Sequence, residues 1–270
     1  MADPTQDSRA WWRTSIIDIE PGRIDIRGYP IQDLIGRLDF VEMIWLMVAG
    51  EKLAPGRRDL LQAALVAAVD HGPLAPSISI ARMAATCGVG LNSAMASAIN
   101  VLGDVHGGAG QECLTIYAAV DERQQAGMAI PDAVEQVLRP YLDKRRNIPG
   151  FGHRFHKRDP RAVKLLALTE AAAARDEVSG RFVAIGRGIE AWLGDQKKTV
   201  LPMNIDGATA VIFAELGVPP ELGRGLFVLS RSVGILAHAW EQTQQGGRIK
   251  GPVPPAVGYT YEGPQNKTDE

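Results

Sequence analysis

The sequence predicts an all-α fold with one small β-hairpin near its N-terminus. From about residue 37 onward, apolar residues recur every three or four positions, which is the period of a helix that buries one face. Glycines and prolines interrupt this pattern repeatedly and divide it into separate helices. One stretch, residues 15–29, instead alternates isoleucine with polar residues, as a half-buried strand does.

The expected elements follow in order along the chain. In SIIDIEPGRIDIRGY, residues 15–29, Pro21-Gly22 separates two alternating halves, so we expect a short two-stranded hairpin. The spacing then predicts helices at residues 37–49, 58–70, 77–87, 91–102, 109–126, 131–143, 160–176, 181–193, 207–216 and 220–245.

Glycine- and proline-containing joints predict a division into two domains. The large helical domain would comprise residues 1–107 and 203–260, and the small helical domain residues 108–202. Residues 261–270 are expected to form a loose tail.

Composition excludes several classes of protein. Of the 270 residues, 46% are hydrophobic and 22% are charged, as in an ordinary soluble globular protein. A formal net charge of −2 gives no global attraction to nucleic acid or to an anionic membrane. No apolar run reaches the ~18 residues that a membrane span needs, and the polar N-terminus lacks a secretory pattern. Cys87 and Cys113 have no metal-ligand spacing, and their apolar, small-residue surroundings indicate core thiols, which favours a reducing cytoplasm.

Positive charge gathers around the loop NIPGFGHRFHKRDPRA, residues 147–162. The basic residues of this region are Lys144, Arg145, Arg146, Arg154, Lys157, Arg158 and Arg161. His153 and His156 lie three apart, a spacing that suits a metal site only on a helix. Gly150 and Gly152 indicate a loop, and the surrounding positive charge would repel a divalent cation, so we predict no metal site. Two phenylalanines are thin support for nucleic acid, and the loop better suits a compact polyanion such as a phosphorylated cofactor.

His106, in GDVHGGAGQE, precedes two glycines and the helix expected from residue 109. Glycines let a ligand approach the backbone closely, and the positive end of a helix disfavours a protonated imidazole. A neutral histidine in this position can stabilise a developing oxyanion. The motif alone also allows a glycine-rich turn whose histidine only caps the helix.

Asp206, in PMNIDGATAVIFAEL, lies directly ahead of an apolar helix. Asp is a favoured N-cap, and an acid there complements the helix dipole, which gives Asp206 a structural explanation. The functional alternative is a carboxylate base beside a thioester or ketone, with a pKa raised by apolar neighbours.

Arg231 lies within a strongly apolar helix, with His238 seven residues later on the same face. A buried arginine without an anion would be strongly destabilising. Its partner is either an acid of the chain, such as Glu241 or Asp195, or a substrate carboxylate held in a bidentate fork. His71, between two expected helices, is a further candidate, for which a core or capping position is the structural alternative.

Taken in order, these motifs resemble the citrate synthase superfamily over about residues 24–252. The motifs are IRGYPIQDL with GEKLAP, DHG with SISIAR, HGGA, PGFGHRFHKRDPRA, NIDG and RSVGILAHAWEQ. GFGHR followed by DPRA and then NIDG is the specific part of the match. The resemblance implies a citrate synthase-like multi-helix fold whose small domain faces coenzyme A.

The resemblance also implies roles for single residues. The family's catalytic positions fall on His106, His153 and Asp206. Its oxo-acid-binding positions fall on His71, Arg161 and Arg231. The loop that would contact coenzyme A falls on Gly150, Gly152, Arg154 and Lys157. His153 would then act on the organic acid rather than on a metal ion.

Short chains with NIDG and FVLSRSVG look more like citryl-CoA lyases, and like the lyase part of ATP-citrate lyase, than like full-length synthases. We therefore expect cleavage of citryl-CoA to acetyl-CoA and oxaloacetate. The coenzyme A thioester is a substrate, no metal or redox cofactor is expected, and the resemblance implies a homodimer or larger homo-oligomer.

Three alternatives stay open. One is a condensing enzyme or lyase that acts on another hydroxyacyl-CoA, because Gly251 stands where the family has an arginine contributed across the dimer. Another is a non-catalytic paralogue that binds coenzyme A thioesters, and the third is a metal-dependent hydrolase, which elemental analysis of the purified protein would distinguish.

Overall fold

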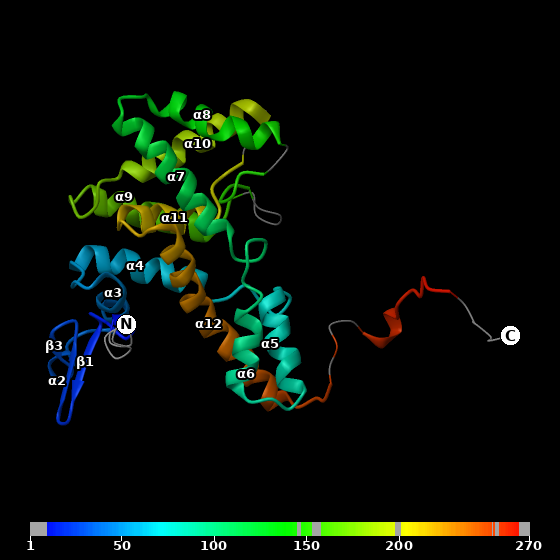
Figure 1. Cartoon of the computed structure of the whole chain (residues 1–270). Helices are drawn as coiled ribbons and strands as arrows, with labels where there is room; N and C mark the ends of the chain where they lie inside the picture. The colour runs from blue at the N-terminus through cyan, green and yellow to red at the C-terminus, as the bar shows by residue number, and fades with distance from the viewer. Residues whose placement is uncertain are drawn as a thin grey trace, which may run out of the picture.

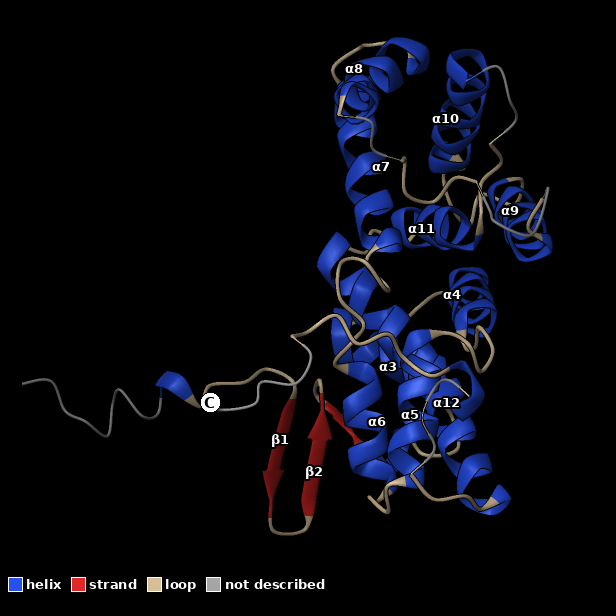
Figure 2. Cartoon of the chain, turned by 90° about the vertical axis from the view of Figure 1, so that its right-hand side faces the viewer, coloured by secondary structure: helices blue, strands red, loops and turns tan. Residues whose placement is uncertain are grey.

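The computed structural model describes residues 10–144, 147–152, 158–197, 201–249, 251 and 254–264. In this part of the chain, helices make up nearly all of the regular structure, and a small antiparallel sheet lies near the N-terminus (Figures 1 and 2). The helices are α2 (Ile31–Leu34), α3 (Phe40–Ala49), α4 (Pro55–Ala68), α5 (Pro76–Thr86), α6 (Leu91–Ile99), α7 (Ala109–Gln125), α8 (Ile130–Asp143), α9 (Pro160–Ala173), α10 (Arg181–Lys197), α11 (Ile205–Glu215) and α12 (Pro220–Gln245). The predicted all-α fold class is confirmed.

The sheet contains the predicted hairpin and one further strand. Strands β1 (Ile17–Glu20) and β2 (Arg23–Ile26) pair antiparallel around Pro21-Gly22, and Gly22 adopts a left-handed φ of 81°. Strand β3 (Tyr29–Pro30) pairs with β2 on its other side. The third strand was not predicted, because two residues are too few to carry an alternating pattern.

Proline marks the start of several helices more closely than apolar spacing does. Pro55, Pro76, Pro160 and Pro220 are the first residues of α4, α5, α9 and α12. Proline suits this position because its fixed φ is helical and its missing N–H would have no partner there. The predicted start at residue 58 was therefore three residues late, since the first turn of α4 is polar.

Of the three apolar clusters in the described residues, the two largest are joined by α12. The larger cluster surrounds α11, whose residues are mostly buried and which packs against α4, α7, α9 and α10. The smaller cluster joins α5, α6 and the second half of α12, with Ile78 and Ile235 fully buried. Helix α12 runs from the larger cluster to the smaller one (Figure 1).

The larger cluster includes residues on both sides of the predicted domain boundaries. Leu61 of α4, Tyr117 of α7 and Leu226 of α12 all belong to it. The division into residues 1–107 with 203–260, and residues 108–202, stays a prediction. Residues 254–264 extend away from the helices (Figure 1).

None of the described helices combines the length and the apolar character needed to cross a bilayer.

Candidate active site

The first turns of three helices meet around His106 and Asp206. Nε2 of His106, which lies just before α7, accepts a hydrogen bond at 3.2 Å from the backbone N–H of Ser77 in α5. Asp206 lies in the first turn of α11. Its Oδ1 is 4.0 Å from the position that a Cβ on Gly110, in the first turn of α7, would occupy. The start of α7 is therefore next to both predicted catalytic side chains.

The contact with Ser77 fixes the proton of His106. A backbone N–H only donates, so Nε2 is the unprotonated nitrogen and the neutral ring carries its proton on Nδ1. Ser77 Oγ also lies 3.0 Å from Nε2. Among the described residues, Nδ1 has no hydrogen-bond partner, so its N–H is available to a ligand. The neutral histidine agrees with the sequence-based expectation, but the helix N-terminus that contacts it is that of α5 rather than α7.

Asp206 is not the N-cap of its helix. The cap is Asn204, whose Oδ1 accepts hydrogen bonds from the backbone N–H groups of Asp206 at 3.0 Å and Gly207 at 3.3 Å. The capping explanation of Asp206 is therefore wrong, because α11 begins at Ile205 and places Asp206 inside its first turn. The Asp206 side chain is half-buried and accepts no hydrogen bond from the described part of the chain.

Common neighbours act on both side chains. Burial lowers the pKa of His106, and the positive charges of Arg231 and His71 lower it further. Burial also raises the pKa of Asp206, although the positive charges of Arg161, Arg231 and His71 oppose this shift. Arg231 and His71 thus act on the pKa values of both His106 and Asp206.

Arg231 is buried, and one edge of its guanidinium group has no hydrogen-bond partner among the described residues. Its side chain lies among buried residues, Nε donates to the carbonyl of Ala68 at 3.1 Å, and Cζ lies 5.0 Å from the ring centroid of Phe227. Glu241, one of the partners considered from the sequence, pairs instead with Arg82 at 2.6 Å. Within the described residues Arg231 forms no ion pair, which leaves its Nη1 and Nη2 edge for an anion.

Arg161 is held by Asp159, a residue that the sequence motifs did not single out. Arg161 Nε donates to Asp159 Oδ1 at 3.0 Å, and Nη2 donates to Oδ2 at 2.8 Å. The buried Asp159 side chain also accepts from the backbone N–H of Ile205 at 3.2 Å. It therefore ties the start of α9 to the start of α11. Its sequence signal is an acid directly before a helix-initiating proline, although that pattern indicates only a cap.

Gly150 and Gly152 pair with the segment that leads into α11. The N–H of Gly152 donates to the carbonyl of Pro202 at 2.8 Å, and the N–H of Asn204 donates to the carbonyl of Gly150 at 2.9 Å. Gly150 has a φ of 82°, and a Cβ there would lie 2.6 Å from Cys113 Sγ. Packing alone thus explains Gly150, and contact of either glycine with coenzyme A stays a prediction.

The rest of the basic loop is not part of the described structure. His153, Arg154, His156 and Lys157 lie outside the described residues. Among the residues that are described, no group of three or more His, Cys, Asp or Glu side chains is arranged to hold a metal ion.

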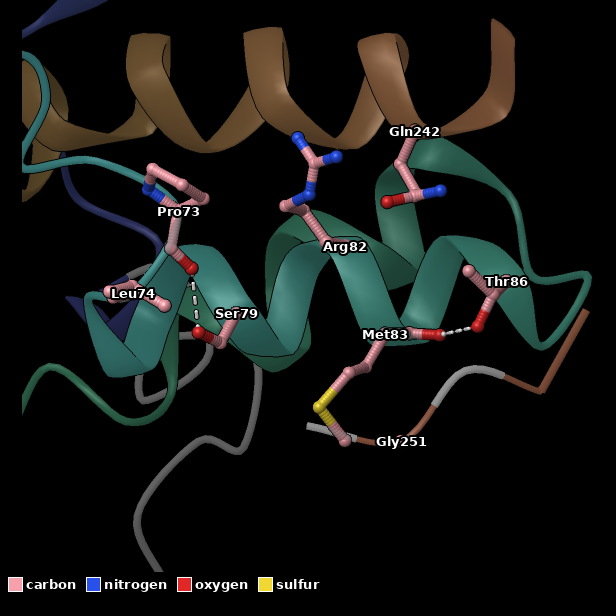
Figure 3. Close-up of a pocket in the computed structure, with 8 residues that line it drawn as sticks. All are labelled: Pro73, Leu74, Ser79, Arg82, Met83, Thr86, Gln242 and Gly251. Atoms are coloured by element: carbon pink, nitrogen blue, oxygen red, sulfur yellow. Dashed lines mark hydrogen bonds between the residues drawn. The ribbon is translucent and has the colours of Figure 1, made fainter. Parts of the chain in front are cut away.

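A pocket of about 160 Å³ is lined mainly by residues of α5 and by Pro73 and Leu74, which precede this helix (Figure 3). Its lining residues are Pro73, Leu74, Ser79, Arg82, Met83, Thr86, Gln242 and Gly251. Ser79 Oγ donates to the carbonyl of Pro73 at 2.7 Å, and Thr86 Oγ1 donates to that of Met83 at 2.7 Å. Figure 3 shows Arg82 rising from α5 toward α12 and Gly251 near Met83.

This fold and this set of side chains agree with the family that the motifs resemble. Residues 47–252 match the family model described as citrate synthase, C-terminal domain. The citrate synthase of Haloferax volcanii is 32% identical over 220 residues, which cover 80% of this chain and 54% of that protein. The chain belongs to the citrate synthase family, and it spans about half the length of the curated relatives it matches.

Solved structures agree in fold. The citryl-CoA lyase of Hydrogenobacter thermophilus is 29% identical with a TM-score of 0.84, and the match covers 96% of this chain and 97% of that one. The ATP citrate lyase of Methanothrix soehngenii, in complex with citrate and coenzyme A, has a TM-score of 0.78 at 21% identity. That match covers 100% of this chain and 46% of the lyase, and at this identity it supports the fold alone.

Proposed function

We propose that this protein is a citryl-CoA lyase, which cleaves citryl-CoA to acetyl-CoA and oxaloacetate. The observation that carries the proposal is that His106, a neutral donor, and Asp206, a carboxyl group with a raised pKa, share Arg231 and His71 as charged neighbours. The two shifts suit a site that stabilises an enolate and moves a proton at carbon.

Oxaloacetate would be bound by His71, Arg161 and Arg231. Arg231 offers the Nη1 and Nη2 edge, which matches a carboxylate in a bidentate pair. On Arg161 the Nε and Nη2 edge is occupied by Asp159, so an oxo-acid would meet the Nη1 side. A dianionic product suits these positive charges.

The thioester half of citryl-CoA would lie against His106 and Asp206. Cleavage of the carbon–carbon bond requires removal of the hydroxyl proton, which we assign to His153. The electron pair moves toward the thioester, and His106 Nδ1–H donates to the enolate oxygen that forms. Protonated Asp206 then delivers a proton to the terminal carbon, which completes acetyl-CoA. Condensation is the same sequence in reverse, with Asp206 as base.

The lyase assignment is supported by the match with the citryl-CoA lyase of Hydrogenobacter thermophilus, which combines 29% identity with a TM-score of 0.84. Within this proposal, Gly150, Gly152, Arg154 and Lys157 contact coenzyme A. The steps use neither a metal ion nor a redox cofactor, and the protein acts as a homodimer or a larger homo-oligomer.

Asp206→Asn tests the proposal directly. We expect the variant to lose about 10²- to 10⁴-fold in the turnover of citryl-CoA, because proton transfer by a positioned side chain contributes about this much. The change leaves the size of the side chain and the cap at Asn204 in place. Release of free acetyl-CoA and of oxaloacetate measures the turnover. Near-normal turnover by the folded variant would show that Asp206 does not move the proton.

A condensing enzyme of the same family is the second candidate, because the curated relatives are citrate synthases. Incubation with citryl-CoA, and with acetyl-CoA or propionyl-CoA plus a panel of oxo-acids, distinguishes the reactions. A preference for condensation with another oxo-acid would replace the lyase assignment. Thioester binding without turnover in any mixture would indicate the non-catalytic paralogue.

A further inference from the structure

One face of α12 leads from Arg231 to a group of polar side chains outside the predicted site. Arg231, Gly234 and His238 are three and four residues apart and therefore lie on this face. A Cβ on Gly234 would lie 2.2 Å from the carbonyl oxygen of Val69 and 3.2 Å from Cβ of Asp70. Only glycine allows this approach, so the turn that follows α4 packs on α12 between Arg231 and His238.

Asp70 closes this turn around His71. Its Oδ2 accepts a hydrogen bond from the backbone N–H of Gly72 at 3.1 Å, across His71, and Gly72 has a φ of 81°. A short acidic side chain that bonds to the backbone two residues later is a common way to fix a turn. The position of His71 therefore depends on where the Asp70 carboxyl group is held.

His238 holds that carboxyl group from α12. Its Nε2 lies 3.3 Å from Asp70 Oδ2, and its Nδ1 lies 3.3 Å from Nη1 of Arg82. A guanidinium group only donates, so Nδ1 accepts and the ring proton is on Nε2, where it donates to Asp70. Arg82 is in turn held by Glu241 at 2.6 Å and by Gln245 at 2.7 Å. His238 is thus fixed in one tautomer between two partners.

The negative charge of Asp70 also acts on Arg231. Burial raises the pKa of Asp70, but hydrogen bonds from His238 and from the backbone of Gly72 and His71 outweigh it and hold this pKa below the ordinary value. The carboxyl group is therefore charged. Burial lowers the pKa of Arg231, and the negative charges of Asp70 and then Asp206 oppose this shift.

We propose that Asp70, held by His238 and Arg82, is a positioning residue for binding of the oxo-acid. It fixes the position of His71, and its negative charge favours the charged form of Arg231. This inference rests on the proposed function. Asp70, His238 and Arg82 need not touch the substrate, and their effect reaches it through the turn that carries His71.

The test compares two substitutions of His238. Glutamine keeps both an acceptor for Arg82 and a donor for Asp70, whereas leucine keeps neither. We expect His238→Leu to weaken oxaloacetate binding, measured by calorimetry, about tenfold, equivalent to about 1.4 kcal/mol. In turnover with oxaloacetate and acetyl-CoA, His238→Leu should raise the KM for oxaloacetate by a larger factor than it lowers kcat. His238→Gln should stay within about threefold of the wild type, since it restores both hydrogen bonds.

Asp70→Ala and the double variant make the test specific. If Asp70 and His238 act through one turn, the double variant should bind oxaloacetate no more weakly than the weaker single variant, because coupled residues are not additive. Gln244→Leu, an exposed change on the same helix, controls for added apolar surface. Circular dichroism establishes that each variant is folded.

The outcomes separate this inference from the proposed function. A wild-type protein that neither binds oxaloacetate nor turns over any thioester overturns the proposed function. A wild-type protein that binds oxaloacetate, with folded His238→Leu and Asp70→Ala variants of unchanged affinity, overturns the positioning inference alone. Additive losses in the double variant would also overturn it, since the two residues would then act separately.

Discussion

Asp206 illustrates how function and stability oppose each other at a single residue. Its carboxyl group is half-buried without a hydrogen-bond donor in the described structure, and burial raises its pKa above the ordinary 3.8. Below pH 3.8 the group is protonated in the folded and unfolded states alike. As the pH rises, the unfolded chain releases its proton first, so the folded state loses stability until its own pKa is passed.

We therefore expect Asp206→Asn to raise the free energy of unfolding at pH 7, and the gain to shrink as the pH falls toward 4. Urea unfolding at several pH values measures the difference. Asp195→Asn, at an exposed position of α10, is the control and should have little effect at either pH. A less stable Asp206→Asn variant at pH 7 would mean that the charged carboxyl group is well compensated in the folded protein.

Single residues were predicted from the sequence as far as local pattern allows. The apolar helix after Asp206 indicated its burial, and glycines beside His106 indicated an open backbone. The pattern did not show that Asn204 caps α11, because Asn204 and Asp206 are both residue types that favour the N-cap. Nor did it show the pairing of Asp159 with the start of α11, which joins segments 46 residues apart.

At the scale of elements, buried polar contacts fix the helices that carry the site. Glu215, the last residue of α11, is buried, and its carboxyl group receives hydrogen bonds from residues around the start of α10. Oε2 accepts from the N–H and hydroxyl groups of Ser179 and from the N–H of Gly180, and Oε1 accepts from the N–H of Phe182 at 2.8 Å. One side chain therefore supplies the acceptors that a helix N-terminus needs.

Glu215→Gln should lower the free energy of unfolding by about 1–3 kcal/mol. The NH2 group of glutamine would face backbone N–H donors and leave them without an acceptor. Chemical denaturation measures the change. Glu170→Gln is the matched control: its contact with Arg187 is exposed, and surface ion pairs contribute about 0–1 kcal/mol. Equal effects of the two substitutions would show that the Glu215 contacts do not support α10.

Helix positions were predictable because apolar spacing and helix breakers are local properties. The expected helix at 220–245 agrees with α12, and that at 91–102 ends three residues later than α6, where polar Asn100 follows Ile99. Which helix N-terminus meets His106 was not predictable. That depends on the packing of α5 against α6 and α12, and nothing in the local sequence encodes such a pairing.

At the scale of the whole molecule, the candidate site joins the two apolar clusters. Asp206 and Arg161 lie on helices of the larger cluster, and Ser77, the partner of His106, lies on α5 of the smaller one. Arg231 lies on α12, which belongs to both. A ligand that contacts residues from both sides would stabilise both clusters, since it binds only when they are assembled.

Oxaloacetate should therefore raise the melting temperature of the whole chain. At a free concentration of a hundred times its Kd, a ligand adds about 2.7 kcal/mol, which for 270 residues corresponds to about 5 °C. Hydrogen exchange should show added protection in both α5 and α11. Arg231→Gln removes the carboxylate fork and should abolish both effects at the same ligand concentration. Protection confined to one cluster would mean that the ligand does not contact the groups brought together by α5, α11 and α12.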